Sequence, residues 1–343
     1  MEYLQFDMSK PRDVVALGRS GIDLYPNEFG PTNQVTTYTK YIGGSPANTA
    51  VQMAKMSISV GFISKVSQDH FGQYVRYYME SQGIDVSNMT NVDDPNVRHS
   101  LAVAEQPEMG SINYFFYRNN DIADLHLSMD DIDESYIAQF KALLISGTSM
   151  CTSPAREAVL LAIEYAHRNN VRVIFDPDHR DISWKTLDEA SLYYWMVAEK
   201  SDLIFGTRDE LDIVERLHLP GNTDDAKSAA ALLKFQPSMV CIKHGEEGSN
   251  VYMKDGTVLH GDIYPARVYK VLGAGDSFAG SFVSRIVRGR PVEEALRYAA
   301  AAASLTISGK ACSASMPKLD VVEDYMKACE NGTIDTWPGW DMI

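Results

Sequence analysis

Short apolar runs alternate with longer amphipathic segments along most of this chain. Runs whose length and composition are typical of buried strands occur at 14–17, 60–63, 143–147, 171–175, 203–206 and 239–242. Segments with hydrophobic residues at helical spacing lie at 46–56, 70–82, 156–168 and 210–217. Because strands that alternate with helices assemble into parallel sheets, we expect an α/β fold. Its doubly wound, mainly parallel sheet should carry helices on both faces.

Two stretches depart from this alternation. Residues 33–42 and 98–116 alternate in polarity or carry β-branched and aromatic runs, and neither has a helical pattern. They are predicted to form antiparallel strands of a smaller β-sheet appended to the core. Beside a doubly wound core, such a flap is expected to serve as a lid, with segments at roughly 30–43 and 97–119.

Composition narrows the class of protein. With 343 residues, 45% of them hydrophobic, the chain can bury a large core, and large α/β folds of this length occur as one domain. The net charge of −15 argues against nucleic acid or an anionic membrane as the main partner, although a local site can still bind small anions.

No targeting or redox signal stands out. The first ten residues lack the build of a signal peptide, and no apolar run approaches the ~18 residues of a membrane span. The cysteines are widely scattered and form no CxxC pair, so neither a disulfide framework nor a zinc site is expected. These features predict a cytoplasmic protein.

The run Gly273-Ala274-Gly275-Asp276 directly precedes a segment of small residues with helical spacing. Two glycines let the backbone pass close to a ligand, and the first helical turn then points its free N–H groups at that ligand. This predicts an anion-binding hole. A carboxylate beside an anion site repels the anion, so it needs a chemical role. Asp276 would have one if it takes a proton from a hydroxyl that attacks a phosphoryl group. The alternative is that Asp276 only caps the helix.

Several polar residues follow predicted strands, at the sheet edge where α/β proteins bind ligands. Each alone is typical of a turn or cap, but together they indicate a site. They are Asp23 after the first strand, then Asp176, Asp178 and Arg180, then Thr207 and Glu210, and finally Lys243, Gly245 and Gly248.

Two further features point to the lid. The pair Gly43-Gly44 could hinge lid and core, and Asn48 in the following helix could bind sugar hydroxyls. Otherwise the pair is a simple turn and Asn48 is solvated. Arg118 ends a lid strand, where it could bind a carboxylate in a fork geometry or remain an exposed charge.

Taken in order, three motifs resemble the ribokinase (PfkB-type) sugar kinase family, over roughly residues 13 to 320. They are Gly43-Gly44-Ser45-Pro46-Ala47-Asn48, Lys243-x-Gly245-x-x-Gly248 and Gly273-Ala274-Gly275-Asp276. The resemblance implies a ribokinase-like core with a small β-sheet lid, as one domain over 13–325 followed by a tail over 326–343. It also implies MgATP as donor and transfer of the γ-phosphoryl group to a sugar hydroxyl.

The resemblance also implies roles for individual residues. Asp276 would be the base, with the backbone of Gly273, Ala274 and Gly275 forming the anion hole. Asp23, Gly43, Gly44 and Asn48 would hold sugar hydroxyls, and Glu210 would order magnesium through water. Thr207, Lys243, Gly245, Gly248 and Lys270 would belong to the nucleotide side of the site.

The chain departs from the family pattern at three positions. Thr207 stands where most members have Asn, and Lys243 stands where many have Thr. Lys270 stands where many members have an Asp that helps to bind a monovalent cation. Because an ammonium group is a compact charge of the same sign, we hypothesise that Lys270 replaces this ion and makes it unnecessary. Alternatively, Lys270 points to solvent.

The segments 18–25 and 270–276 resemble the branch of the family that phosphorylates 5-dehydro-2-deoxygluconate in myo-inositol breakdown. Arg118 and Arg180 would suit the carboxylate of a sugar acid. A 2-keto-3-deoxygluconate kinase, a fructokinase and a non-catalytic sugar-binding regulator remain alternatives, as does a dinucleotide-dependent oxidoreductase, although the GxGxxG fingerprint is absent. Exposed edges of the lid strands favour a homodimer.

Overall fold

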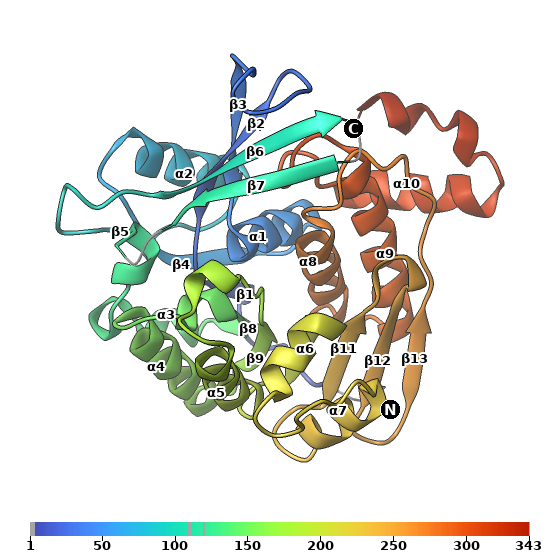
Figure 1. Cartoon of the computed structure of the whole chain (residues 1–343). Helices are drawn as coiled ribbons and strands as arrows, with labels where there is room; N and C mark the ends of the chain where they lie inside the picture. Colours follow the sequence, from blue (N-terminus) through green and yellow to red (C-terminus); the bar gives the residue numbers. More distant parts are fainter. Residues whose placement is uncertain (1–3, 109–110, 119–120, 343) are drawn as a thin grey trace.

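The computed structural model describes residues 4–108, 111–118 and 121–342, and its core is a nine-stranded sheet (Figure 1). The strand order is β13-β12-β11-β10-β9-β8-β1-β4-β5. All neighbouring pairs are parallel except β11–β12 and β12–β13, which are antiparallel. The strands are β1 (Arg12–Leu17), β4 (Val60–Val66), β5 (Met89–Asn91), β8 (Phe140–Ser146), β9 (Arg172–Asp176), β10 (Leu203–Thr207), β11 (Met239–Lys243), β12 (Ser249–Met253) and β13 (Val258–Gly261).

Helices cover both faces of this sheet, as the alternating sequence pattern predicts. Val14 and Ala16 of β1 pack into one apolar cluster with α1, α8 and α9, whereas Val15 and Leu17 pack into another with α4 and α5. The described helices are α1 (Ser45–Lys55), α2 (His70–Ser81), α3 (Glu134–Ile137), α4 (Ala155–Arg168), α5 (Leu187–Ala198), α6 (Arg208–Glu215), α7 (Asp225–Leu232), α8 (Ala274–Ile286), α9 (Val292–Ser308) and α10 (Leu319–Glu330). None of them is long and apolar enough to span a membrane.

The lid is a four-stranded sheet with the order β3-β2-β6-β7. Its strands are β2 (Gly21–Pro26), β3 (Tyr38–Gly43), β6 (Ser100–Glu108) and β7 (Ser111–Tyr117). The predicted lid segments do form antiparallel pairs, β3 with β2 and β6 with β7, and the parallel pairing of β2 with β6 joins the two pairs into one sheet. The sequence analysis missed β2, since six residues that include a glycine and a proline carry too little alternation to identify a strand.

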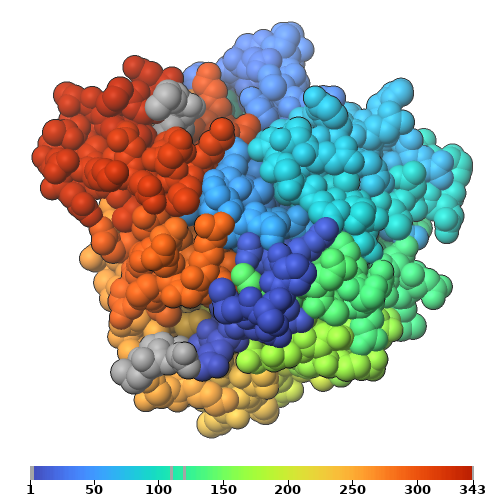
Figure 2. Space-filling model, turned by 180° about the vertical axis from the view of Figure 1, so that it is seen from behind, coloured from blue at the N-terminus to red at the C-terminus, as the bar shows by residue number. Residues whose placement is uncertain are grey.

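The N-terminal segment covers the amino ends of the core strands. Figure 2 shows this segment in dark blue between the green and orange parts of the chain. The Arg172 side chain at the start of β9 donates a hydrogen bond to the Gln5 carbonyl. Leu4 and Phe6 pack against the apolar core. The carboxyl ends of the core strands lie on the opposite side of the sheet, which faces the lid.

The C-terminal residues pack against α9 and α10. Trp337 is buried, with its ring 5.2 Å from that of Tyr325 and 5.4 Å from that of Trp340. The expected boundary between 325 and 326 falls inside α10, so the tail begins as part of a packed helix.

Candidate active site

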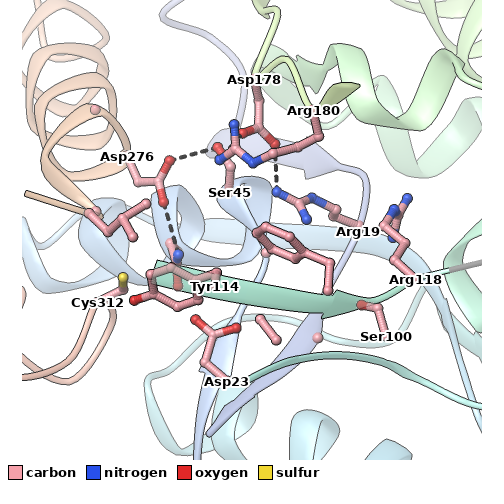
Figure 3. Close-up of a pocket in the computed structure, with 18 of the residues that line it drawn as sticks. Arg19, Asp23, Ser45, Ser100, Tyr114, Arg118, Asp178, Arg180, Asp276 and Cys312 are labelled. Atoms are coloured by element: carbon pink, nitrogen blue, oxygen red, sulfur yellow. Dashed lines mark hydrogen bonds and ion pairs between the residues drawn. The ribbon is translucent and has the colours of Figure 1, made fainter. Parts of the chain in front are cut away.

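A cavity of about 200 Å³ lies between the lid and the carboxyl edge of the core sheet (Figure 3). Lid strands β2, β6 and β7 form one wall, and the ends of β9, β10 and β11 with the starts of α1 and α8 form the other. The cavity brings together most of the predicted site residues: Asp23, Gly44, Asn48, Arg118, Arg180, Thr207, Glu210, Lys243, Gly273, Gly275 and Asp276. Gly43, Ala274, Gly245, Gly248 and Lys270 do not line it.

Asp276 lies in the first turn of α8 and turns its carboxylate toward α1. Its oxygens accept hydrogen bonds from Ser45 Oγ at 2.7 Å and Asn48 Nδ2 at 2.9 Å. The helix is capped by the backbone of Gly273 at φ 86°, so the alternative that Asp276 is only a cap is wrong. Burial, reinforced by the charge of Asp178, raises the pKa of Asp276. A raised pKa strengthens a carboxylate as a proton acceptor.

Ser45 and Asn48 are one helical turn apart at the start of α1, so they present neighbouring side chains. The Asn48 amide donates to Asp276, and its Oδ1 is buried without a hydrogen-bond partner among the described residues. This free acceptor suits a hydroxyl donor. The sequence analysis quoted Ser45 without a role, although its spacing from Asn48 was a usable signal.

Asp23 lies within lid strand β2 rather than at the end of a core strand. A Cβ on Gly43 would lie 1.9 Å from Asp23 Oδ1, so Gly43 provides the space for this carboxyl group. Gly44 adopts φ 93° and passes close to the Arg19 carbonyl, where a Cβ would lie 2.8 Å away. Burial raises the pKa of Asp23 to about 7, although Arg19 opposes the shift. The glycine pair thus shapes the wall of the cavity around Asp23.

Lys243 extends from the end of β11 to the start of α8. Its Nζ lies 3.6 Å from Asp176 Oδ2, and a Cβ on Gly275 would be 3.4 Å from it. Burial disfavours the ammonium charge, but Asp176 and Glu210 outweigh this effect and raise the pKa of Lys243. A charged lysine therefore lies beside the first turn of α8 and adds to the positive potential of the helix N-terminus.

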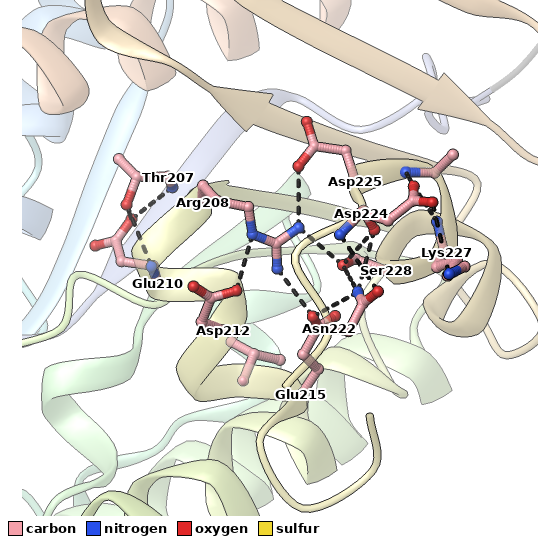
Figure 4. Close-up of polar contacts among 12 residues, drawn as sticks. Thr207, Arg208, Glu210, Asp212, Glu215, Asn222, Asp224, Asp225, Lys227 and Ser228 are labelled. Carbon is pink, nitrogen blue, oxygen red and sulfur yellow. Dashed lines mark hydrogen bonds and ion pairs between the residues drawn. The ribbon is translucent and has the colours of Figure 1, made fainter. Parts of the chain in front are cut away.

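Thr207 and Glu210 form a capping box on α6 (Figure 4). Glu210 Oε2 accepts from the Thr207 backbone N–H at 2.8 Å, and the Thr207 hydroxyl accepts from the Glu210 N–H at 3.3 Å. Because Thr serves as an N-cap much as Asn does, the departure from the family pattern keeps this local structure. Glu210 Oε1 accepts one bond from the His179 N–H, which leaves lone pairs for metal-bound water.

Gly245 and Gly248 lie in the turn between β11 and β12, with φ of 58° and 84°. A Cβ on Gly248 would be 2.2 Å from the Gly261 carbonyl oxygen, so this turn requires glycine. Neither glycine is among the residues that line the cavity.

Lys270 is completely buried, so the alternative that it points to solvent is wrong. Its Nζ donates a hydrogen bond to the Leu272 carbonyl, directly before the glycine that begins the turn into α8. Burial lowers the pKa of Lys270, while Cys312, Asp276 and Asp23 oppose that shift.

Arg118 and Arg180 both line the cavity, but protein oxygen atoms already accept hydrogen bonds from their terminal nitrogens. Arg118 is buried and makes a two-pronged ion pair with Asp124 at 2.9 and 3.1 Å. Arg180 Nη2 lies 2.7 Å from Asp178. The alternative of Arg118 as an exposed charge is therefore wrong. The expected open fork for a ligand is not present either, because Nε is the one guanidinium nitrogen of Arg118 that has no partner within the described chain.

Arg19 is a cavity residue that the sequence analysis missed. It lies in the turn between β1 and β2, and its Nη2 donates to Asp178 Oδ2 at 2.9 Å. Nothing in the local sequence distinguishes a buried arginine from an exposed one, because the missed strand β2 made this turn look like a surface loop.

The lid contacts the core beside the start of α8. Tyr25 of β2 has its hydroxyl 3.1 Å from Cys312 Sγ, and Tyr114 of β7 donates to the Tyr25 hydroxyl at 2.8 Å. A Cβ on Gly273 would in turn lie 3.1 Å from Cys312 Sγ. The lid therefore packs directly onto the residues that support the turn into α8.

Structures of known kinases share this fold. A putative ribokinase II from E. coli in complex with ATP and Mg²⁺ aligns with a TM-score of 0.82 at 22% identity, over 92% of this chain and 99% of that one. A fructokinase from Xylella fastidiosa with bound ATP also aligns with a TM-score of 0.82, at 18% identity over 93% and 99% of the two chains. These similarities confirm the predicted ribokinase-like fold.

Sequence comparison identifies the family. The model of the pfkB family carbohydrate kinases matches residues 11–319. A protein of Geobacillus thermodenitrificans named 5-dehydro-2-deoxygluconokinase is 43% identical over 95% of this chain and 96% of its own length. The protein of that name in Bacillus subtilis is 41% identical over 94% of this chain and 98% of its own length. These matches confirm the resemblance and make the oxidoreductase alternative wrong. The chain belongs to the pfkB family of carbohydrate kinases, which are phosphotransferases acting on sugar hydroxyls.

Proposed function

We propose that this chain transfers the γ-phosphoryl group of MgATP to the primary hydroxyl of 5-dehydro-2-deoxy-D-gluconate, forming its 6-phosphate in myo-inositol degradation. The observation that carries the proposal is a cavity with a buried carboxylate, Asp276, at one end and two arginines, Arg19 and Arg118, at the other (Figure 3). The names of the relatives support the same substrate. A six-carbon acid carries its terminal hydroxyl and its carboxylate at opposite ends of one chain, which fits this arrangement.

In this mechanism Asp276 accepts the proton of the attacking hydroxyl. Ser45 and Asn48 hold both oxygens of the carboxylate, so Asp276 keeps one orientation during the transfer. Asn48 Oδ1 accepts a hydrogen bond from the sugar. The packed lid excludes water, which limits hydrolysis of the donor.

MgATP supplies the phosphoryl group, and the residues at the start of α8 fit its charge. The backbone from Gly273 to Gly275 offers free N–H groups, and Lys243 adds a fixed ammonium beside them. Glu210 would hold water molecules of the magnesium ion through its remaining lone pairs. Gly245 and Gly248 would shape the outer part of the nucleotide site.

Measuring ADP release with MgATP tests this function. We expect strong preference for 5-dehydro-2-deoxygluconate over 2-keto-3-deoxygluconate, fructose and ribose. Preference for 2-keto-3-deoxygluconate would keep a sugar acid kinase but reject the substrate. Preference for fructose would show that the substrate is not a sugar acid. No turnover with any of these sugars would favour a sugar-binding regulator.

We propose that the Lys270 ammonium takes the place of a monovalent cation. Its charge lies beneath the turn into α8, bonded to the Leu272 carbonyl. We expect wild-type activity to be unchanged when potassium is replaced by tetramethylammonium, and Lys270→Met to lose at least ~10-fold in kcat, about 1.4 kcal/mol in barrier. A strong potassium requirement of the wild-type enzyme would reject this role.

We also propose a homodimer formed through the lids. Phe115 and Tyr117 of β7 are 50% and 67% exposed, on the face of the lid away from the cavity, and β7 is an edge strand. Sedimentation should show a dimer that Phe115→Glu weakens, whereas Leu217→Glu, at a similarly exposed site outside the lid, should not. A monomer at all concentrations would contradict this proposal.

A further inference from the structure

Arg19 and Arg118 lie at the end of the cavity away from Asp276 (Figure 3). Each guanidinium has a carboxylate partner, since Asp124 pairs with Arg118 and Asp178 pairs with Arg19. Their charges are therefore matched within the protein, and what a ligand can still use is the hydrogen-bonding capacity that these pairs leave open.

Arg19 is the guanidinium with the most unused hydrogen-bonding capacity in this group. Its side chain is 7% exposed, and it makes one ion pair, through Nη2 to Asp178. Its Nε is buried and has no partner in the described parts of the chain, and the same holds for Arg118 Nε. A buried N–H group without a partner is destabilising, so two of them beside one cavity point to an acceptor that arrives with the ligand.

Arg19 is held in a defined position beside the cavity. Its turn joins core strand β1 to lid strand β2, whereas Arg118 follows the last residue of lid strand β7. Gly44 packs against the Arg19 carbonyl, and Asp178 fixes the side-chain end. The side chain is held at both ends, so it presents Nε without further reorganisation.

We propose that Arg19, together with Arg118 Nε, binds the carboxylate of the sugar acid and sets the preference for acids over neutral sugars. The inference rests on the proposed sugar acid kinase function and adds the residue that determines its specificity. Arg180 also interacts with the charges of Asp276, Glu210 and Asp176, so it belongs to the phosphoryl end of the cavity as much as to this one.

Comparing the acid with its carboxamide tests this assignment, because the two substrates differ in one charge. For Arg19→Gln we expect kcat/KM for 5-dehydro-2-deoxygluconate to fall about 10- to 150-fold, mostly through KM, as for a lost charged hydrogen bond. The value for the carboxamide should change little. Arg19→Lys keeps the charge but not the planar donors. Its kcat/KM for the acid should lie between the values of the wild type and of Arg19→Gln.

Arg285→Gln is the matched control, since Arg285 is 9% exposed in an ion pair with Glu294 that lies outside the cavity. It should leave the ratio between acid and carboxamide unchanged. Calorimetric binding of the acid without ATP supplies a readout independent of turnover, and Arg19→Gln should weaken it by the same factor. If Arg19→Gln fails to fold, Arg19→Lys carries both measurements.

The outcomes separate this inference from the proposed function. Equal losses with acid and carboxamide in Arg19→Gln would show that Arg19 only supports Asp178, and would overturn the inference. Wild-type enzyme that phosphorylates the carboxamide as well as the acid would instead overturn the sugar acid function. Selective loss with the acid supports both.

Discussion

Replacing Asp276 with asparagine is expected to lower kcat by ~10²–10⁴-fold while the protein remains folded. The amide has no basic oxygen to take the proton of the attacking hydroxyl. Its shape and hydrogen bonds can be retained, because Ser45 can accept from the new amide and Asn48 can still donate to its oxygen. Steady-state kinetics with saturating MgATP and sugar would measure the loss.

Stability provides a second test of the same variant. The folded-state pKa of Asp276 is raised, so the wild-type protein loses stability as the pH rises from the unfolded pKa toward the folded one. The asparagine variant lacks this penalty. It should match the wild type at acidic pH and be the more stable protein at neutral pH in thermal unfolding.

Asp202→Asn is a suitable control for both tests. Asp202 is also buried, but it bonds to Arg172 and the Val173 N–H at the amino edge of the sheet, far from the cavity. Its replacement should reduce stability and spare kcat. Near-normal turnover by Asp276→Asn would show that another group accepts the proton.

Replacing Lys243 with methionine is expected to reduce kcat by ~10²–10³-fold, the range for removing a preorganised charge from a transition state. Methionine retains the length and packing of the side chain but removes the ammonium beside Gly275. The loss should appear in kcat more than in KM for the sugar, since Lys243 lies beside the start of α8, where the proposed phosphoryl donor would bind.

The same change leaves Asp176 without its cation, so some of the loss could come from destabilisation. Breaking a buried ion pair costs up to ~3–5 kcal/mol. The double variant Lys243→Met/Asp176→Asn should recover stability without recovering activity. Lys141→Met provides the matched control. Lys141 is 11% exposed and pairs with Asp13 at 2.7 Å near the starts of β8 and β1, at the end of the sheet away from the cavity. Recovery of activity in the double variant would assign Lys243 a structural role alone.

Much of the site follows from short sequence signals. The run from Gly273 to Asp276 identifies the start of α8 and the candidate base, and Gly43-Gly44 identifies the start of α1. The two helix starts are predicted correctly because positive φ at glycine and helix initiation depend on a few neighbouring residues. Strand β2 and the turn that carries Arg19 escaped detection, since their local pattern is short and mixed.

The sequence by itself determined the alternating core, the lid as an insertion and the chemical groups at the strand ends. Tertiary structure alone decided which polar groups meet: Asn48 reaches Asp276 across 228 residues, and Arg19 reaches Asp178 across 159. It also buried Lys270 and matched Arg118 with Asp124. The physical reason is that periodicity and backbone conformation are local properties. Burial and charge pairing depend instead on which elements pack together.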